Sequence, residues 1–482
     1  MAVLSGIEPA VVFKYFEEIC AIPHGSGNTK QISDYCVRFA KEHGLRYIQD
    51  NSNNVILFKD GSAGYEQSAP VIIQGHLDMV CEKTEDCQID FEKDGLSLRV
   101  DDGIISAEGT TLGGDDGIAV AFALAILASD DIAHPPLEIV LTVDEEIGMF
   151  GAADLDYSHL KSRTMLNLDS EEEGILLVSC AGGARADCRL PINHEKSDGI
   201  MATVKIQGLT GGHSGVEIDK GRANANQLLG RFLYELGKEV SYALVSVSGG
   251  LKDNAIPRES AAKLVIFQTE VTAVNELVDK YRRVFKNEYS SPDPELDLTI
   301  VCGEEGQFQV MDDSSKKRVI TALYNLPGGI QRMSVDIPGL VQTSLNMGIL
   351  KTLDDEVEMS FAIRSSLGTE KDEMISRLTS LMEALGGTVE CTGDYPAWEY
   401  KQDSKLRDLM VQIFEEQYGH KPEVQAIHAG LECGLFAGKL PGLDCISFGP
   451  EMKDIHTTNE RLNIASVQRT WNYVLEILKR LK

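Results

Sequence analysis

Three consecutive carboxylates end the segment Pro136–Gly148, and their position suits them to chemistry. The residues before them are rich in Val and Ile, which is typical of a buried strand. Because side chains alternate along a strand, Glu145 and Glu146 point in different directions where that strand stops. One carboxylate can then bind a cation while the other moves protons. An isolated Asp-Glu-Glu is more often a charged strand end that faces solvent, so the decision depends on the rest of the chain.

Two other predicted strands end at groups that bind metals. An apolar run within Ala69–Val80 leads into His76 and Asp78, and the strand over residues 164–169 ends at Asp169. Strands that alternate with helices predict a largely parallel α/β sheet. In open sheets of this kind, ligands bind at the carboxyl ends of the strands, where these side chains lie.

A Gly-rich turn and a late histidine complete a set of nitrogen and oxygen donors. Asp115 precedes an apolar helix expected over Ile118–Ser129, where a carboxylate can cap exposed N–H groups. The five candidate metal ligands are His76, Asp115, Glu146, Asp169 and His456. These donors are too few for two separate four-ligand sites, but they suffice if one carboxylate bridges two ions. A set without thiolate suits Zn²⁺, with Mn²⁺ or Co²⁺ as competitors.

The same residues predict a hydrolytic mechanism. Two metals about 3.5–4 Å apart would polarise a carbonyl group and hold a bridging hydroxide at neutral pH. Asp78 shares a face with His76 on an extended backbone, so it could fix the orientation of the imidazole. Glu145, left free by Glu146, would take the proton from the water and pass it to the leaving nitrogen. The sequence offers no comparable role for Asp144.

Composition and charge limit the partners. The chain has 482 residues, enough for about two to three domains, and its net charge is −30. Such a charge repels nucleic acid and anionic membranes, so neither is expected as a partner. The start shows no secretory signal, and no stretch of about 18 apolar residues occurs. Ten scattered cysteines without a Cys-x-x-Cys pair indicate reduced thiols, and we expect a cytoplasmic protein.

The order of the predicted elements indicates an inserted domain. Strand–helix–strand–strand–helix–strand order over residues 185–396 is typical of a ferredoxin-like α+β sandwich, and the length leaves room for two. We expect residues 1–184 and 397–482 to form an α/β catalytic domain that this insertion interrupts. Chain termini that lie near each other make such insertions tolerable. The inserted segment would act as a lid.

Several segments resemble the co-catalytic zinc metallopeptidases of the M20 clan. The segments that carry this likeness are Gly75–Val80, Thr111–Gly117, Asp144–Gly148, Leu166–Ser170 and the late His456. Others narrow it to the bacterial aminoacyl-histidine dipeptidases: Ser179–Gly183, Gly211–Gly215, Gly221–Asn226, Asn254–Glu259 and Ile427–Gly434. The resemblance covers nearly the whole chain, and its segments occur in family order.

The resemblance implies two zinc ions per chain and a role for each ligand. The ligands it implies are His76 and Asp169 for one zinc, Glu146 and His456 for the other, and Asp115 as the bridge. Asp78 would orient a ligand histidine, and Glu145 would act as general base and then as general acid. Asp116 departs from the family pattern, because members of the family often have Asn there, and it adds negative charge beside the bridge.

Candidate substrate contacts lie in the lid and in one late loop. In the wider clan, the lid histidine that matches His213 steadies the tetrahedral oxyanion, and the resemblance implies that role here. Arg364, at a predicted strand end, could grip the C-terminal carboxylate of the substrate as a fork. The remaining candidates are Asn254 and Arg258 for substrate contact and Glu432, beside His428, for the free amine of the substrate. Whether His213 acts in its own chain or in that of a homodimer partner stays open.

The resemblance thus implies a dipeptidase that cleaves unblocked dipeptides, including carnosine-type dipeptides with a C-terminal histidine. Closure of the lid would complete the site and exclude bulk water. Neighbouring activities of the clan remain as alternatives: aminotripeptidase, carboxypeptidase and N-acyl amino acid deacylase. An inactive metal-binding homologue is a remote alternative, against which the complete ligand set and Glu145 argue.

Overall fold

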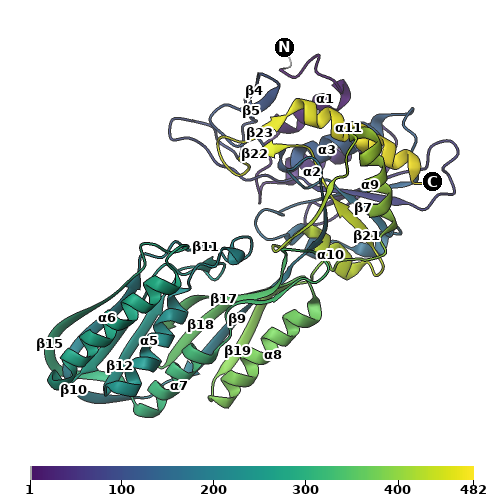
Figure 1. Ribbon diagram of the computed structural model, residues 1–482. Helices are drawn as coiled ribbons and strands as arrows, with labels where there is room; N and C mark the ends of the chain where they lie inside the picture. Colours follow the sequence, from purple (N-terminus) through teal and green to yellow (C-terminus); the bar gives the residue numbers. More distant parts are fainter. Residues whose placement is uncertain (1–2) are drawn as a thin grey trace. The chain divides into compact units, whose positions relative to one another are not determined.

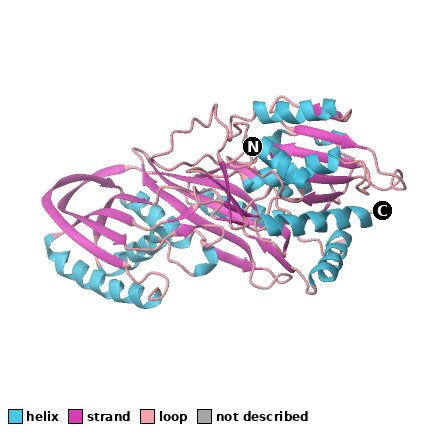
Figure 2. Cartoon of the chain, turned by 90° about the horizontal axis from the view of Figure 1, so that it is seen from above, coloured by secondary structure: helices cyan, strands magenta, loops and turns pink. Residues whose placement is uncertain are grey.

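Two units make up the chain, and each has its own sheet with its own helices (Figures 1 and 2). The computed structural model describes residues 3–482, so the first two residues of the predicted catalytic domain lie outside it. Unit 1 consists of residues 3–180, 400–426 and 431–482, and unit 2 consists of residues 181–399 and 427–430. The boundaries expected from the sequence, at 184 and 397, lie a few residues from these.

The sheet of unit 1 has parallel strands at its centre. Its order is β1-β2-β6-β3-β7-β21-β8-β20. These strands span Arg46–Gln49 (β1), Val55–Lys59 (β2), Leu137–Thr142 (β6), Val71–His76 (β3), Thr164–Asn167 (β7), Asp444–Ser447 (β21), Ile175–Cys180 (β8) and Glu423–Ile427 (β20). β3 is parallel to β6 and β7, and β7 is parallel to β21, whereas β2 is antiparallel to β6. The predicted α/β class, with a mixed sheet that is parallel at its centre, is confirmed.

Apolar sequence explains the core of unit 1. Every residue of β3 and β6 is buried, as expected of central strands. Helix α3 (Gly114–Ala128) is buried around its whole circumference, because its sequence is apolar on all sides. The other helices are α1 (Ala10–Cys20), α2 (Lys30–Glu42), α4 (Phe150–Asp154), α9 (Lys405–Tyr418), α10 (Glu432–Lys439) and α11 (Ile464–Arg480). A small separate sheet contains β4 (Leu98–Asp101), β5 (Ile104–Ala107), β22 (Met452–Lys453) and β23 (Arg461–Asn463).

Unit 2 contains one large sheet made of two ferredoxin-like halves. Its main order is β15-β10-β14-β12-β17-β18-β9-β19, and β16 pairs with β17. The strands are β9 (Gly182–Pro191), β10 (His194–Gln207), β12 (Tyr242–Gly249), β14 (Ser260–Ile266), β15 (Asp297–Met311), β16 (Gly329–Met333), β17 (Val341–Thr352), β18 (Glu356–Ser365) and β19 (Thr388–Tyr395). Helices α5 (Ala225–Glu239), α6 (Val271–Glu288), α7 (Asp313–Asn325) and α8 (Gly368–Ala384) lie on one face (Figure 1).

The two halves have the same strand order. Numbered along the chain within each half, the strands lie in the order fourth, first, third, second, which is the ferredoxin-like order. The first half contains β10, β12, β14 and β15, and the second contains β9, β17, β18 and β19. The halves join where β12 pairs with β17, at Ser248–Lys351 and Gly249–Leu350. This order agrees with the predicted duplication.

Along the chain, the whole first half lies between β9 and the other strands of the second half. Strand β9 precedes β10, whereas the other strands of its half follow β15. A short separate ladder of β11 (Gly212–His213) and β13 (Ala255–Ile256) also belongs to unit 2. Within residues 3–482, no helix combines the length and the apolar character that crossing a membrane requires.

We expect the core of unit 2 to depend strongly on α6. Phe285 on this helix is fully buried, whereas Phe267, just before it, is 53% exposed. Phe285→Ala should lower the free energy of unfolding of unit 2 by about 3–5 kcal/mol, because it removes apolar contacts and leaves a cavity. Phe267→Ala should change it by less than about 0.5 kcal/mol. Hydrogen exchange of unit 2 peptides in urea would measure both, and equal losses would contradict the assigned core.

Candidate metal centre and active site

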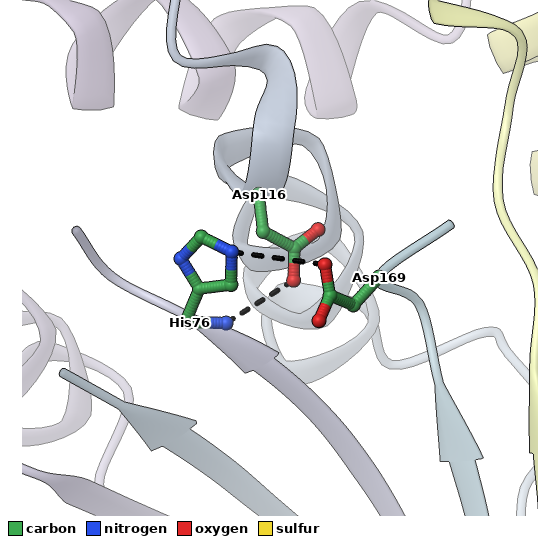
Figure 3. Close-up of side chains that lie close together, drawn as sticks. All are labelled: His76, Asp116 and Asp169. Atoms are coloured by element: carbon green, nitrogen blue, oxygen red, sulfur yellow. Dashed lines mark hydrogen bonds and ion pairs between the residues drawn. The ribbon is translucent and has the colours of Figure 1, made fainter. Parts of the chain in front are cut away.

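The parallel centre of the unit 1 sheet brings candidate ligands to one edge. Strand β3 ends at His76, and its neighbours β6 and β7 lead into Glu145 and Asp169. Because these strands run in the same direction, their carboxyl ends lie on the same side. Figure 3 shows His76 and Asp169 pointing toward one another, and both are buried. The strand-end pattern in the sequence therefore corresponds to a cluster in space.

The turn before α3 places Asp115 against β3. Gly113 has a left-handed backbone with φ 67°, and Asp115 is not yet helical, with φ −84° and ψ 104°. A β-carbon at Gly75 would lie 2.5 Å from Asp116 Oδ2 and 2.8 Å from Ala119 Cβ. Only glycine at position 75 lets the strand and the turn approach this closely.

The Asp115 carboxylate faces both candidate histidines. Its Oδ1 lies 3.1 Å from His76 Nε2, and its Oδ2 lies 3.2 Å from His456 Nε2. Asp169 Oδ1 is 3.7 Å from His76 Nε2, and Glu146 Oε1 is 2.8 Å from His456 Nε2. Donors around one tetrahedral Zn²⁺ are about 3.3–3.5 Å apart, given bonds of ~2.0–2.2 Å. The donor atoms of Asp115, Glu146 and His456 all lie within 4.8 Å of one another, so these residues could hold a metal ion. Around His76 the groups that meet the same limit are His76 with Asp116 and Asp169, and His76 with Glu145 and Glu146.

Carboxylates dominate the electrostatics of this cluster. Burial alone would lower the pKa of His76, but hydrogen bonds to Asp115 and Asp169 raise it well above its usual range. Asp115 and Glu146 raise the pKa of His456 to about 10. Without a metal, both imidazoles are therefore protonated at neutral pH and serve as the counter-charges. A divalent cation takes over that function when the imidazoles bind it as neutral ligands.

Glu145 has the surroundings of a proton acceptor. Burial is the main cause that raises its pKa to about 9, and the carboxylates of Asp169 and Glu146 add to this effect while His76 opposes it. At neutral pH this carboxyl group therefore carries a proton in the metal-free protein, and it can accept a proton from water only when bound cations lower its pKa. Its position beside the candidate ligands, and not among their closest contacts, leaves it available for proton transfer.

Asp78 connects three parts of the site. Its Oδ2 accepts a hydrogen bond from Ser26 Oγ at 2.7 Å, and its Oδ1 accepts one from the backbone N–H of Glu145 at 3.1 Å. Its main-chain oxygen lies 2.9 Å from His76 Nδ1, closer than its carboxylate at 3.5 Å. The nearer acceptor for the imidazole is thus the carbonyl, and the carboxylate holds the backbone of Glu145.

His213 and Arg364 lie near one another in unit 2. His213 Nδ1 accepts from the backbone N–H groups of Gly215 and Val216, both at 3.2 Å, so the other ring nitrogen, Nε2, carries the hydrogen of the neutral ring. Burial and then the charge of Arg364 lower the pKa of His213. A β-carbon at Gly215 would lie 2.9 Å from His213 Cε1 and 3.1 Å from Arg364 Nε. The side chains of His213 and Arg364 therefore both approach Gly215, where a larger residue would contact them too closely.

Two nitrogens of the Arg364 guanidinium differ in their surroundings. Its Nη1 donates to Tyr395 Oη at 3.1 Å, whereas its Nε is buried and has no hydrogen-bond partner among residues 3–482. His428 Nε2 lies 2.7 Å from Ser344 Oγ. Burial, and then Arg364 and His213, lower the pKa of His428 to about 3, so this ring is neutral. The cluster thus has one fixed positive charge.

Three other predicted substrate residues have partners within the protein. Arg258 Nε donates to Leu209 O at 3.2 Å, and Asn254 O accepts from Ser214 N at 2.9 Å. Glu432 is fully buried in unit 1, where its carboxylate accepts hydrogen bonds from Gln74 Nε2 at 2.5 Å and Thr142 Oγ1 at 2.6 Å. Their contacts with a substrate remain predictions.

Comparison with known proteins identifies the family of this chain. The sequence profile of peptidase family M20/M25/M40 matches residues 72–480. The chain belongs to this family. The cytosol non-specific dipeptidase of Escherichia coli (strain K12) is 38% identical over 483 residues, which cover 100% of this chain and 99% of the relative.

Solved structures agree with this M20/M25/M40 membership. The aminoacylhistidine dipeptidase from Vibrio alginolyticus is 37% identical, with a TM-score of 0.92, and the match covers 99% of this chain and 97% of that one. The aminopeptidase PepT from Bacillus cereus ATCC 10987 is 15% identical with a TM-score of 0.57, covers 98% and 99%, and shows the fold alone. The resemblance to M20-clan metallopeptidases, and among them to aminoacyl-histidine dipeptidases, is confirmed.

Asp116, the departure from the family pattern that the resemblance implied, is fully buried beside His76. Its Oδ2 accepts the backbone N–H of His76 at 3.1 Å, and its Oδ1 has no hydrogen-bond partner among residues 3–482 (Figure 3). Burial, and then the charges of Asp169 and Asp115, raise the pKa of Asp116 well above its usual range. A protonated carboxyl group has nearly the size of an amide, so the acceptor function is kept.

The sequence did not predict the contacts by which Ser26 and Asp144 hold one loop against the site. Ser26 lies in the segment Pro23-His-Gly-Ser-Gly-Asn28 and donates to Asp78. Asp144, for which the sequence offered no role, has φ 56° and accepts the backbone N–H of Gly27 at 2.7 Å. The two contacts fix the same loop to the ends of β3 and β6. The only sequence signal was the Gly-rich turn before α2, which by itself indicates a turn.

The raised histidine pKa values predict that metal binding releases protons. At pH 7 His76 and His456 are protonated in the metal-free protein, and each must lose its proton to bind a metal. Zn²⁺ loading should therefore release at least two protons per chain, with a further one if Glu145 ionises, and the affinity should fall as the pH is lowered. Calorimetry in two buffers of different ionisation enthalpy measures the number of protons released. His456→Gln should lower it by about one, whereas the surface change His159→Gln should not; no release from the wild type would contradict this reasoning.

Proposed function

We propose that this chain is a two-zinc dipeptidase that hydrolyses the peptide bond of unblocked dipeptides, including dipeptides with C-terminal histidine. One observation carries the proposal: the two oxygens of Asp115 face the Nε2 atoms of two different histidines, His76 and His456. Asp169 and Glu146 complete the two halves of the donor set. Nitrogen and oxygen donors suit Zn²⁺, with Mn²⁺ or Co²⁺ as competitors.

Glu145 performs the proton transfers in this proposal. Divalent ions bound at the donor set supply Lewis acidity for the peptide carbonyl group. Glu145 takes a proton from the attacking water and then donates it to the leaving nitrogen. Its raised pKa keeps it protonated in the metal-free protein, so this role requires bound cations, whose positive charge lowers that pKa. Asp78 keeps the Glu145 backbone in place through the N–H···Oδ1 hydrogen bond.

Unit 2 carries the candidate groups for the developing charge and for the substrate terminus. The Nε2–H of His213 would donate to the oxyanion, since its other ring nitrogen already accepts two backbone N–H groups. Arg364 would bind the C-terminal carboxylate of the substrate. Among residues 3–482, no group forms a hydrogen bond with its buried Nε. Asn254, Arg258 and Glu432 remain candidates for further substrate contacts.

Cellular context is proposed from charge and from relatives. A net charge of −30 disfavours nucleic acid and anionic membranes as partners. The E. coli relative is named a cytosol dipeptidase, which supports a cytoplasmic location for this chain. A homodimer through unit 2 stays open.

A small substrate panel tests the proposed reaction. The wild-type protein should cleave Leu-Gly and carnosine, and it should leave an N-acetyl amino acid intact. A preference for a tripeptide would indicate an aminotripeptidase, and cleavage of the acetylated compound alone would indicate a deacylase and end the dipeptidase proposal.

Glu145→Gln tests the proposed mechanism with the same substrates. It should lower kcat by about 10²–10⁴-fold, because the general base is lost, while the metal content stays near two per chain by elemental analysis. Glu172→Gln, an exposed acid in the same unit, should leave both unchanged. Full activity of Glu145→Gln would disprove the assigned base.

Arg364 is tested with substrates that differ only at the C-terminus. Arg364→Ala should reduce kcat/KM for a dipeptide by about 10–100-fold, since a hydrogen bond to a charged group contributes ~1.5–3 kcal/mol. For the same dipeptide with a C-terminal amide, Arg364→Ala should reduce kcat/KM much less. Arg185→Ala removes a half-exposed arginine of β9 that pairs with Asp187, and it should affect neither substrate. Equal losses for acid and amide would rule out a carboxylate contact.

A further inference from the structure

Glu460 is a buried acid outside the donor set, and it binds the turn that carries Asp115. It is 3% exposed. Its Oε2 accepts from the backbone N–H groups of Leu112 at 2.7 Å and Gly113 at 3.2 Å. Its Oε1 accepts from Gly114 at 2.8 Å and from Asp115 at 3.5 Å. One carboxylate thus receives the N–H groups of four consecutive residues.

This turn needs an acceptor from elsewhere in the chain. Its N–H groups precede the regular part of α3, so they have no carbonyl one turn earlier to bind. They are also buried, and a buried N–H without an acceptor is costly. Gly113 in the left-handed conformation and the extended Asp115 point these groups toward one place.

The segment that carries Glu460 also carries a candidate ligand. His456 lies four residues earlier, and Glu460 N donates to Thr457 O at 3.1 Å within the same turn. Strand β23 begins at the next residue, Arg461. One short segment therefore supplies His456 to the donor set and Glu460 to the backbone of Asp115.

We propose that Glu460 is a positioning residue that fixes the bridging carboxylate of Asp115 relative to His456. Its acceptor oxygens keep the turn over residues 112–115 in the conformation in which Asp115 Oδ1 faces His76 and Oδ2 faces His456. Loosening the turn would misplace Asp115, mainly at the half of the site that contains Glu146 and His456, since that half depends on the same segment. The inference rests on the proposed two-metal function.

Glu138 provides a matched control for this inference. It is also a buried acid of unit 1, 5% exposed, and its carboxylate accepts the backbone N–H groups of Lys161 and Ser162 at 3.0–3.1 Å. It lies near the start of β6, far along the strand from Glu145. Glu138→Gln therefore damages a similar carboxylate–backbone contact without touching the donor set.

The experiment compares full-length Glu460→Gln, Glu460→Asp and Glu138→Gln with the wild type. An amide has one acceptor oxygen, and its NH₂ group would face N–H donors, whereas Asp keeps the charge but is one methylene shorter. Thermal unfolding of metal-free protein measures stability. Competition with a chromogenic chelator measures the affinity for each equivalent of Zn²⁺, the absorption spectrum with Co²⁺ reports ligand geometry, and dipeptide hydrolysis gives kcat and KM.

Both Gln variants should unfold at lower temperature, but only Glu460→Gln should change the metal centre. Its affinity for the weaker Zn²⁺ equivalent should fall by about 10–100-fold, the size of effect seen when residues that orient metal ligands are replaced. Its Co²⁺ spectrum should change, and kcat should fall while KM stays within about twofold. Glu460→Asp should lie between Glu460→Gln and the wild type, and Glu138→Gln should match the wild type in metal affinity.

Two results would overturn the inference. One is unchanged affinity for both Zn²⁺ equivalents in Glu460→Gln, and the other is an equal loss of affinity in Glu138→Gln at an equal loss of stability. If Glu460→Gln does not fold, Glu460→Asp decides, and wild-type affinity in that variant counts against the inference. A wild-type protein that binds no metal would refute the proposed function itself, which is a different outcome.

Discussion

The crowding of buried carboxyl groups around two imidazoles is the constraint on which the site depends. Asp115, Glu146 and Asp169 lie within 4 Å of a histidine nitrogen, and more acids stand behind them. Ionised acids this close repel one another, and burial makes the repulsion stronger. In the metal-free protein, bound protons offset the excess negative charge, as the raised pKa values of Glu145 and His456 indicate. Divalent cations would offset more of this negative charge than protons do, so we expect the cluster to be more stable with metal bound.

A second layer of acids holds the backbone of the residues that do the chemistry. Asp78 accepts the N–H of Glu145, Asp116 accepts the N–H of His76, and Glu460 accepts the N–H groups of the turn that ends at Asp115. In all three contacts a carboxyl group fixes the main chain, rather than the side chain, of its neighbour. A main-chain contact sets both the position of the α-carbon and the direction of the side chain, which suits a site whose donor atoms must meet within tenths of an ångström.

The sequence predicted the centre of unit 1 well because its signals are local. Apolar runs that stop at acids or at His76 give both the strands and their ends, and parallel pairing then brings those ends together. The contacts of Ser26 and Glu460 could not be predicted in this way. Glu460 lies 345–348 positions from its donors, and a buried acid among Asn and Arg leaves no periodic pattern. In unit 2 the duplication was only suspected, since β9 is separated from the rest of its half by the whole of the other half.

This interleaving also explains why the unit 2 cluster is invisible in the sequence. His213 lies on β11, beside the first half, whereas Arg364 lies on β18 of the second half, and His428 comes from a segment far later in the chain. Their proximity depends on the joint between β12 and β17 and on the missing side chain of Gly215, where a β-carbon would be 2.7 Å from His428 O. The second half alone holds Arg364 but not His213, and the first alone holds His213 without the charge of Arg364, which adds to burial in lowering the pKa of the ring. The pairing of the two halves therefore brings a neutral imidazole and a fixed cation together within unit 2.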